Sequence, residues 1–158
     1  MRIIDFTGQE NIRSEGHTSK GDQPKWKQAG NWYKADHMGY EALSEIIVSR
    51  LLAWSDADDF VSYQPVRIHY NGKVVSGCSS RDFMRKGEML IPFERLHRAY
   101  EGRGLAQTLT RVDSPTARIA YTVDFVERVT NLTGVGAYLT AILELDCLTL
   151  NEDRHTNN

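Results

Sequence analysis

The last eight residues of the sequence combine carboxylate, imidazole and amide side chains directly after a strongly apolar segment. Asp153 and Asn158 stand five positions apart in this stretch. A carboxylate can accept the proton of a substrate hydroxyl, and an amide oxygen is one of the hard ligands that Mg²⁺ prefers. These residue types therefore suit a loop for magnesium-dependent chemistry on a hydroxyl group. A polar surface turn after a buried helix is the alternative.

Two further stretches accompany this loop in a fixed order. Residues 32–36 read Trp-Tyr-Lys-Ala-Asp and are followed by Gly-Tyr-Glu-Ala-Leu-Ser-Glu at 39–45, and residues 75–79 read Val-Ser-Gly-Cys-Ser. Together with Asn-Glu-Asp-Arg-His at 151–155 and the Asn at 158, they resemble the HipA-like serine/threonine kinases. In that family the usual His-Arg-Asp order of the catalytic loop becomes Asp-Arg-His.

The resemblance implies an α+β, protein-kinase-like fold. A small antiparallel sheet lobe with one helix would span residues 1–77, and a helical lobe ending in the catalytic loop would span residues 78–158. The implied activity is ATP-dependent phosphorylation of Ser or Thr on a protein substrate, as in bacterial toxin kinases. ATP and Mg²⁺ are the implied cofactors, and an antitoxin-like protein is a possible partner.

Four residues receive roles from the resemblance. Asp153 would act as the catalytic base, Asn158 would bind magnesium, and Lys34 would reach the nucleotide phosphates. Glu41 would orient Lys34 and is preferred by its Gly-Tyr-Glu context, with Glu45, one helical turn later, as the alternative. Without the resemblance, Lys34 would be interpreted as a surface lysine at a strand end, and both glutamates as favourable charges near a helix N-terminus.

The polar stretch from 7 to 30 is predicted to be a mobile loop or a phosphate cradle. Gly16, Ser19 and Gly21 lie in its most glycine- and hydroxyl-rich part, where backbone amides could wrap a phosphate. No Walker motif and no regular Gly-x-Gly-x-x-Gly supports this assignment. Three hydroxyl residues of the same stretch are candidates for self-phosphorylation: Ser14, Thr18 and Ser19. Three lysines of this region are rivals of Lys34: Lys20, Lys25 and Lys27.

Patterning predicts the elements that must position these residues. Apolar residues at intervals of three and four predict a helix over 39–54, and Asn71-Gly72 predicts a tight hairpin between two strands. Gly77 and Cys78 begin a stretch of small residues that interrupts the strand pattern. By resemblance, this stretch lies near the hinge whose backbone binds adenine, where Cys78 would pack and would not react.

The second half of the chain is helical in composition. Phe93, Leu96 and Tyr100 mark one helix, Ser114-Pro115 opens another, and Thr133 could cap a third that runs from 134 to about 148. The leucines and isoleucine of that last helix are expected to be largely buried.

Composition excludes several classes of protein. The chain has 158 residues, a net charge of −2 and 41% hydrophobic residues, which indicates one or two small globular units and does not favour nucleic-acid binding. No apolar run approaches the length of about 20 residues that a membrane span needs, and the N-terminus lacks signal-peptide character, so a cytoplasmic location is expected. Cys78 and Cys147 are far apart, which fits reduced thiols.

Kinases usually carry a second metal-binding Asp after the catalytic loop, and this sequence stops at Asn158. We therefore expect an incomplete form of such a kinase, with little activity unless a second chain completes the lobe. A pseudokinase or a nucleotide- or protein-binding fragment without turnover is the first alternative. A hydrolase that uses Asp153 and His155 is a weaker one, because no nucleophile is placed beside them. His155 is expected to support the loop by hydrogen bonding.

Overall fold

The computed structural model describes residues 2–12, 23–37, 39–151 and 154–157, which form parts of two compact units, Met1–Glu88 and Met89–Asn158. In their described parts, the first unit combines a sheet with one helix and the second unit is helical, so the α+β class is confirmed. The sequence placed the division at residue 77. The division falls later because the last strand of the first unit continues to Arg81.

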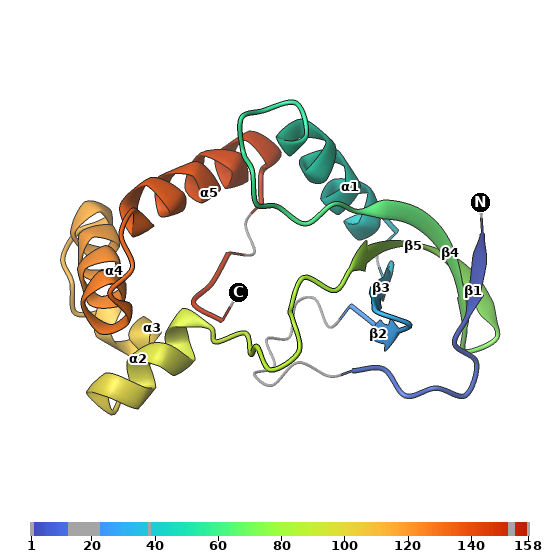
Figure 1. Ribbon diagram of the computed structural model, residues 1–158, viewed down its shortest axis with the longest axis horizontal. Helices are drawn as coiled ribbons and strands as arrows, with labels where there is room; N and C mark the ends of the chain where they lie inside the picture. The colour runs from blue at the N-terminus through green and yellow to red at the C-terminus, as the bar shows by residue number, and fades with distance from the viewer. Residues whose placement is uncertain (1, 13–22, 38, 152–153, 158) are drawn as a thin grey trace. The chain divides into compact units, whose positions relative to one another are not determined.

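Within the described part of the first unit, five strands form one mixed sheet (Figure 1). The strands are β1 (Ile3–Asp5), β2 (Lys25–Gln28), β3 (Asn31–Ala35), β4 (Gln64–Tyr70) and β5 (Lys73–Arg81). Their order is β1-β4-β5-β3-β2, so β5 is central and is paired along both edges. The sheet was expected to be antiparallel, but β1 runs parallel to β4, so the sheet is mixed.

The hairpin between β4 and β5 confirms the turn prediction. Tyr70 pairs with Lys73 across the turn, and Asn71 and Gly72 adopt φ angles of 50° and 71°. Positive φ at both central residues is what a two-residue hairpin of the favoured twist requires.

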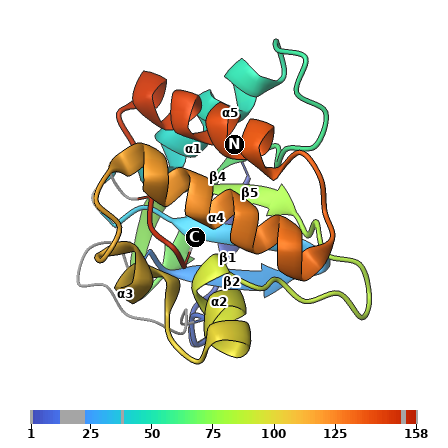
Figure 2. The same ribbon diagram turned by 90° about the vertical axis from the view of Figure 1, so that its left-hand side faces the viewer.

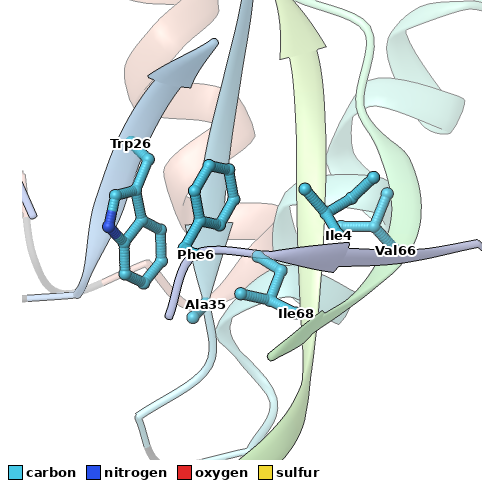
Figure 3. Close-up of a cluster of buried hydrophobic side chains, with 6 residues drawn as sticks. All are labelled: Ile4, Phe6, Trp26, Ala35, Val66 and Ile68. Carbon is cyan, nitrogen blue, oxygen red and sulfur yellow. The ribbon is translucent and has the colours of Figure 1, made fainter. Parts of the chain in front are cut away.

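The strand β2 was missed, because its surroundings are polar and rich in glycine. Trp26, in the middle of β2, is almost completely buried and stacks on Phe6 with ring centroids 4.7 Å apart (Figure 3). The same core cluster contains Ile4, Ala35, Val66 and Ile68. A single aromatic residue thus recruits an otherwise polar segment into the sheet, since burying it stabilises the fold by about 2–3 kcal/mol.

The helix α1 (Glu41–Leu52) confirms the predicted helix and contacts β5 and β4. Ala42 and Ser49 are its buried residues, whereas the predicted apolar stripe is exposed at Leu43, Ile47, Leu51 and Trp54. Asp36, directly after β3, accepts a hydrogen bond of 2.7 Å from the backbone N–H of Ala42 and so fixes the start of the helix. The face of α1 that meets the sheet is therefore small and polar.

The second unit contains α2 (Phe93–Glu101), α3 (Leu105–Leu109), α4 (Pro115–Thr130) and α5 (Val135–Thr149) (Figure 2). Its core cluster is formed by Phe125, Val126 and Val135. Ser114 caps α4 as predicted, accepting from the N–H of Ala117 at 3.1 Å.

Two expectations for α5 were wrong. Thr133 is not its cap: Gly134 holds that position at a φ of 83°, and Glu127 accepts from the N–H of Val135 at 3.0 Å. The apolar residues Leu139, Ile142, Leu143 and Leu145 are only half-buried. None of the described helices combines the length and apolar character needed to cross a membrane.

Candidate functional site

The site is built on the sheet face that α1 covers. On β3, Tyr33 and Ala35 belong to the apolar core, so strand alternation turns Lys34 to the opposite face. Lys34 pairs in register with Cys78 on β5, and α1 contacts β5. Two strands and a helix therefore meet at Lys34.

Lys34 forms an ion pair with Glu45 of α1, its Nζ donating to Oε1. The same ammonium donates to the Tyr63 hydroxyl at 3.1 Å and lies 5.0 Å from the centroid of the Tyr63 ring. The side chains of Lys34 and Glu45 keep 26% and 27% of their surface exposed, so a ligand can reach the pair from solvent.

Cys78 forms a further hydrogen bond with the Glu45 carboxylate. Its thiol donates to the second oxygen of Glu45, Oε2, at 2.9 Å. Burial, together with the negative charge of Glu45, raises the pKa of the Cys78 thiol well above its usual range. The thiol thus stays protonated and acts as a hydrogen-bond donor, and because Cys78 is fully buried it packs as expected.

The charges of the cluster are set by opposing effects. Burial disfavours the ammonium form of Lys34, but the Glu45 carboxylate and Tyr63 together raise the pKa of Lys34 above its ordinary value. Burial also raises the pKa of Tyr63, so that its hydroxyl keeps its proton. At neutral pH the cluster therefore presents a protonated lysine beside a neutral phenol.

Lys34 is paired with Glu45, not with Glu41, the glutamate that the sequence preferred. The Glu41 carboxylate accepts hydrogen bonds from the backbone N–H groups of Gly39 at 3.0 Å and Tyr40 at 3.2 Å. It thereby organises the turn that leads into α1. Glu45 lies one turn further along the helix, on the side that contacts β5, which explains the exchange of roles.

The rival lysines described by the structure lie elsewhere. Lys25 and Lys27 are in β2, and Lys27 forms an ion pair of 2.6 Å with Asp82. Of the described lysines, Lys34 therefore remains the candidate for phosphate binding, because it lies on β3 and forms an ion pair with a residue of α1.

Gly77 and Cys78 lie within a continuous strand. They lie in the middle of β5, where Gly77 pairs with Ala35 on β3 and with Val66 on β4. Their backbone groups pair within the sheet, so the predicted interruption of the strand at these residues is wrong. Small residues occur here for a packing reason: a Cβ at Gly77 would lie 2.4 Å from the Lys34 carbonyl oxygen.

Several predicted site residues lie outside the described residues: Gly16, Ser19 and Gly21 of the proposed phosphate cradle, and Asp153 and Asn158 of the C-terminal loop. Described neighbours of that loop are well anchored. Asp146 of α5 accepts two hydrogen bonds from the Arg154 guanidinium at 2.7 and 2.9 Å and one from the Asn151 side chain at 2.7 Å. On the other side, the Thr156 hydroxyl donates to Glu94 of α2 at 2.9 Å.

His155 has the supporting contact that was expected of it. Its Nδ1 accepts a hydrogen bond of 3.2 Å from the backbone N–H of Asn157, two residues later. Such a bond shapes the local turn of the chain.

Tyr63 was missed by sequence reasoning. It belongs to no motif and precedes β4 in an irregular segment, where its backbone N–H donates to the buried Ser49 hydroxyl of α1 at 3.2 Å. Only the tertiary arrangement brings it to Lys34. Among the described residues, no group of three or more His, Cys, Asp and Glu side chains could hold a metal ion, whereas Lys34 and Tyr63 offer polar hydrogens to an anion.

Comparisons of the chain with protein-family models, with curated proteins and with solved structures find no significant match.

Proposed function

We propose that this chain binds Mg²⁺–ATP through Lys34 and functions in ATP-dependent phosphorylation of a Ser or Thr hydroxyl on a protein, as a HipA-like kinase. The observation that supports the proposal is the ion pair between Lys34 on a strand and Glu45 on the helix that covers it. Protein kinases use such a strand-lysine and helix-glutamate pair to hold the nucleotide phosphates.

The chemistry explains why this pair is informative. Phosphoryl transfer depends on positioning and on the neutralisation of phosphate charge, which a fixed ammonium group supplies. A partly buried ion pair adds little to folding stability, because desolvation offsets much of the attraction. In this proposal Asp153 accepts the substrate proton and Asn158 binds magnesium, with Lys34 as the phosphate clamp and Glu45 as its orienting partner.

Isothermal titration calorimetry with Mg²⁺–ATP tests the proposal on the chain and on its Lys34→Ala variant. We expect micromolar binding that weakens at least about tenfold in the variant, because a charge-assisted contact contributes about 1.5–3 kcal/mol. Lys73→Ala, an exposed lysine at the β4–β5 turn, is the matched control and should bind as the parent does.

A parent chain that is folded by circular dichroism and does not bind Mg²⁺–ATP would contradict the proposal. If the parent chain binds Mg²⁺–ATP, phosphoryl transfer is followed next, with γ-labelled ATP and a protein substrate. A chain that binds Mg²⁺–ATP but shows no Asp153-dependent transfer would instead support the pseudokinase alternative.

A further inference from the structure

Lys34 has one ammonium hydrogen beyond those used by its described partners. An ammonium group carries three donors, and the contacts with Glu45 and Tyr63 occupy two of them. The carboxylate and the phenol thus hold Nζ from two sides and leave its third hydrogen for a ligand.

Tyr63 is in the same situation. Its hydroxyl oxygen accepts from Lys34, which can only donate, so the phenolic proton must point to another acceptor. Among the residues that the structure describes, none is in hydrogen-bond contact as an acceptor for that proton. The hydroxyl keeps its proton at neutral pH, since burial raises the pKa of Tyr63.

The two free hydrogens are close together and rigidly held. The Nζ and OH atoms that carry them are 3.1 Å apart, which suits two oxygens of one phosphoryl group or a single oxygen shared by both donors. Tyr63 is fixed at its backbone by the hydroxyl of Ser49, which is itself buried. On the opposite side, Cys78 fixes Glu45.

We propose that Tyr63 is a second phosphate-binding residue, whose hydroxyl donates to the same phosphoryl group that Lys34 binds. The inference rests on the proposed function for the identity of the ligand, a nucleotide polyphosphate. It assigns to Tyr63 a direct contact with the ligand, in addition to its contact with Lys34.

The test uses Tyr63→Phe, which keeps the ring beside Lys34 and the backbone contact to Ser49 and removes only the hydroxyl. Tyr33→Phe is the matched control, because Tyr33 precedes Lys34 on the same strand and faces the opposite side, against Phe6. The probes are Mg²⁺–ATP, adenosine and inorganic tripolyphosphate, each measured by calorimetry.

We expect Tyr63→Phe to weaken the binding of Mg²⁺–ATP and of tripolyphosphate about 10- to 100-fold, because a hydrogen bond to a charged group is lost. The affinity for adenosine should stay unchanged, and Tyr33→Phe should behave as the parent. If Lys34→Ala weakens ATP binding while Tyr63→Phe does not, the inference about Tyr63 is overturned and the proposed function stands.

The reverse failure gives a different result. A parent chain that binds tripolyphosphate but not ATP, with the binding weakened in Tyr63→Phe, would support the phosphate site and contradict the kinase proposal. A folded chain that binds neither ligand would overturn both.

Discussion

Replacing Gly77 by alanine tests how closely β3 approaches β5 at the site. Gly77 lies in the central strand, opposite Ala35. An added Cβ would lie 2.4 Å from the Lys34 carbonyl oxygen and 2.7 Å from the Cδ1 atom of Ile68, well inside the usual separation of non-bonded atoms. The Ile68 side chain can turn aside, but the Lys34 carbonyl belongs to a strand paired on both edges.

Overpacking of this kind costs about 1–3 kcal/mol. Because a backbone atom in the middle of a sheet must move, we expect Gly77→Ala to lower the free energy of unfolding of the first unit by about 2–3 kcal/mol. The same displacement shifts Lys34 relative to Glu45, so Mg²⁺–ATP affinity should fall as well. All three tryptophans, Trp26, Trp32 and Trp54, lie in the first unit, so urea unfolding followed by tryptophan fluorescence reports on that unit.

Gly136→Ala is the control for this experiment. A Cβ there would meet the Val123 side chain at 3.7 and 3.9 Å, which is ordinary contact. Alanine inside α5 should stabilise that helix by up to about 1 kcal/mol and leave the tryptophan transition unchanged. Equal urea midpoints for Gly77→Ala and the parent would refute the close approach of β3 to β5.

Three further predictions concern buried polar groups. Folding raises the pKa of Cys78, so the stability that its protonated thiol contributes is complete below the unfolded pKa of about 9.0 and is lost as the pH rises beyond it. Raising the pH from 8 to 10 should therefore lower the free energy of unfolding of the parent by about 1 kcal/mol more than that of Cys78→Ala in urea titrations, and equal losses would contradict the assignment. Asp146→Asn removes the charge that binds Arg154, a half-exposed guanidinium, and should lower the free energy of unfolding by about 1–2 kcal/mol when unfolding is followed by circular dichroism. An unchanged stability would contradict this prediction. His97 is fully buried and is hydrogen-bonded to the Arg103 carbonyl at 2.7 Å and to a tyrosine hydroxyl at 2.8 Å. His97→Phe should therefore lower the free energy of unfolding by about 1–3 kcal/mol in thermal or urea unfolding, and a variant as stable as the parent would refute the role of these bonds.

Features that depend on local chemistry were predictable from the sequence. The Asn71-Gly72 turn has its signal in two adjacent residues, because few residues tolerate positive φ. Ser114 and Pro115 fix the start of α4 in the same way. The existence of α1 also followed from its periodic apolar residues, although the exposed position of Leu43 and Ile47 did not.

The partner of Lys34 could not be predicted, because it depends on how α1 is rotated against the sheet. Glu41 and Glu45 are one turn apart at the start of the same helix, so both were candidates, and the Gly-Tyr-Glu context favoured Glu41. The rotation places Glu45 towards β5, and Cys78 can reach it only because β3 and β5 pair with Lys34 opposite Cys78. Tyr63 carries no local signal at all, since its position depends on contacts with α1 and β3.

The continuation of β5 through its small residues was missed for a related reason. Gly77 lowers strand propensity, and the sequence pattern was therefore interpreted as an interruption. In the sheet, the lack of a side chain at this position is what allows β3 to approach. The predicted interruption was wrong because a packing requirement was mistaken for a break in the strand.

The most direct test of the site is a titration of Lys34 by NMR, with ¹³C-labelled lysine, in the parent chain and in the matched variants Glu45→Gln and Glu41→Gln. The Glu45 carboxylate is the charge that overcomes the burial of Lys34, so the pKa of Lys34 should lie above its ordinary value of 10.5 in the parent and in Glu41→Gln. In Glu45→Gln it should fall, because burial is then less opposed. A fall in Glu41→Gln with no change in Glu45→Gln would contradict the pairing on which the proposed site depends.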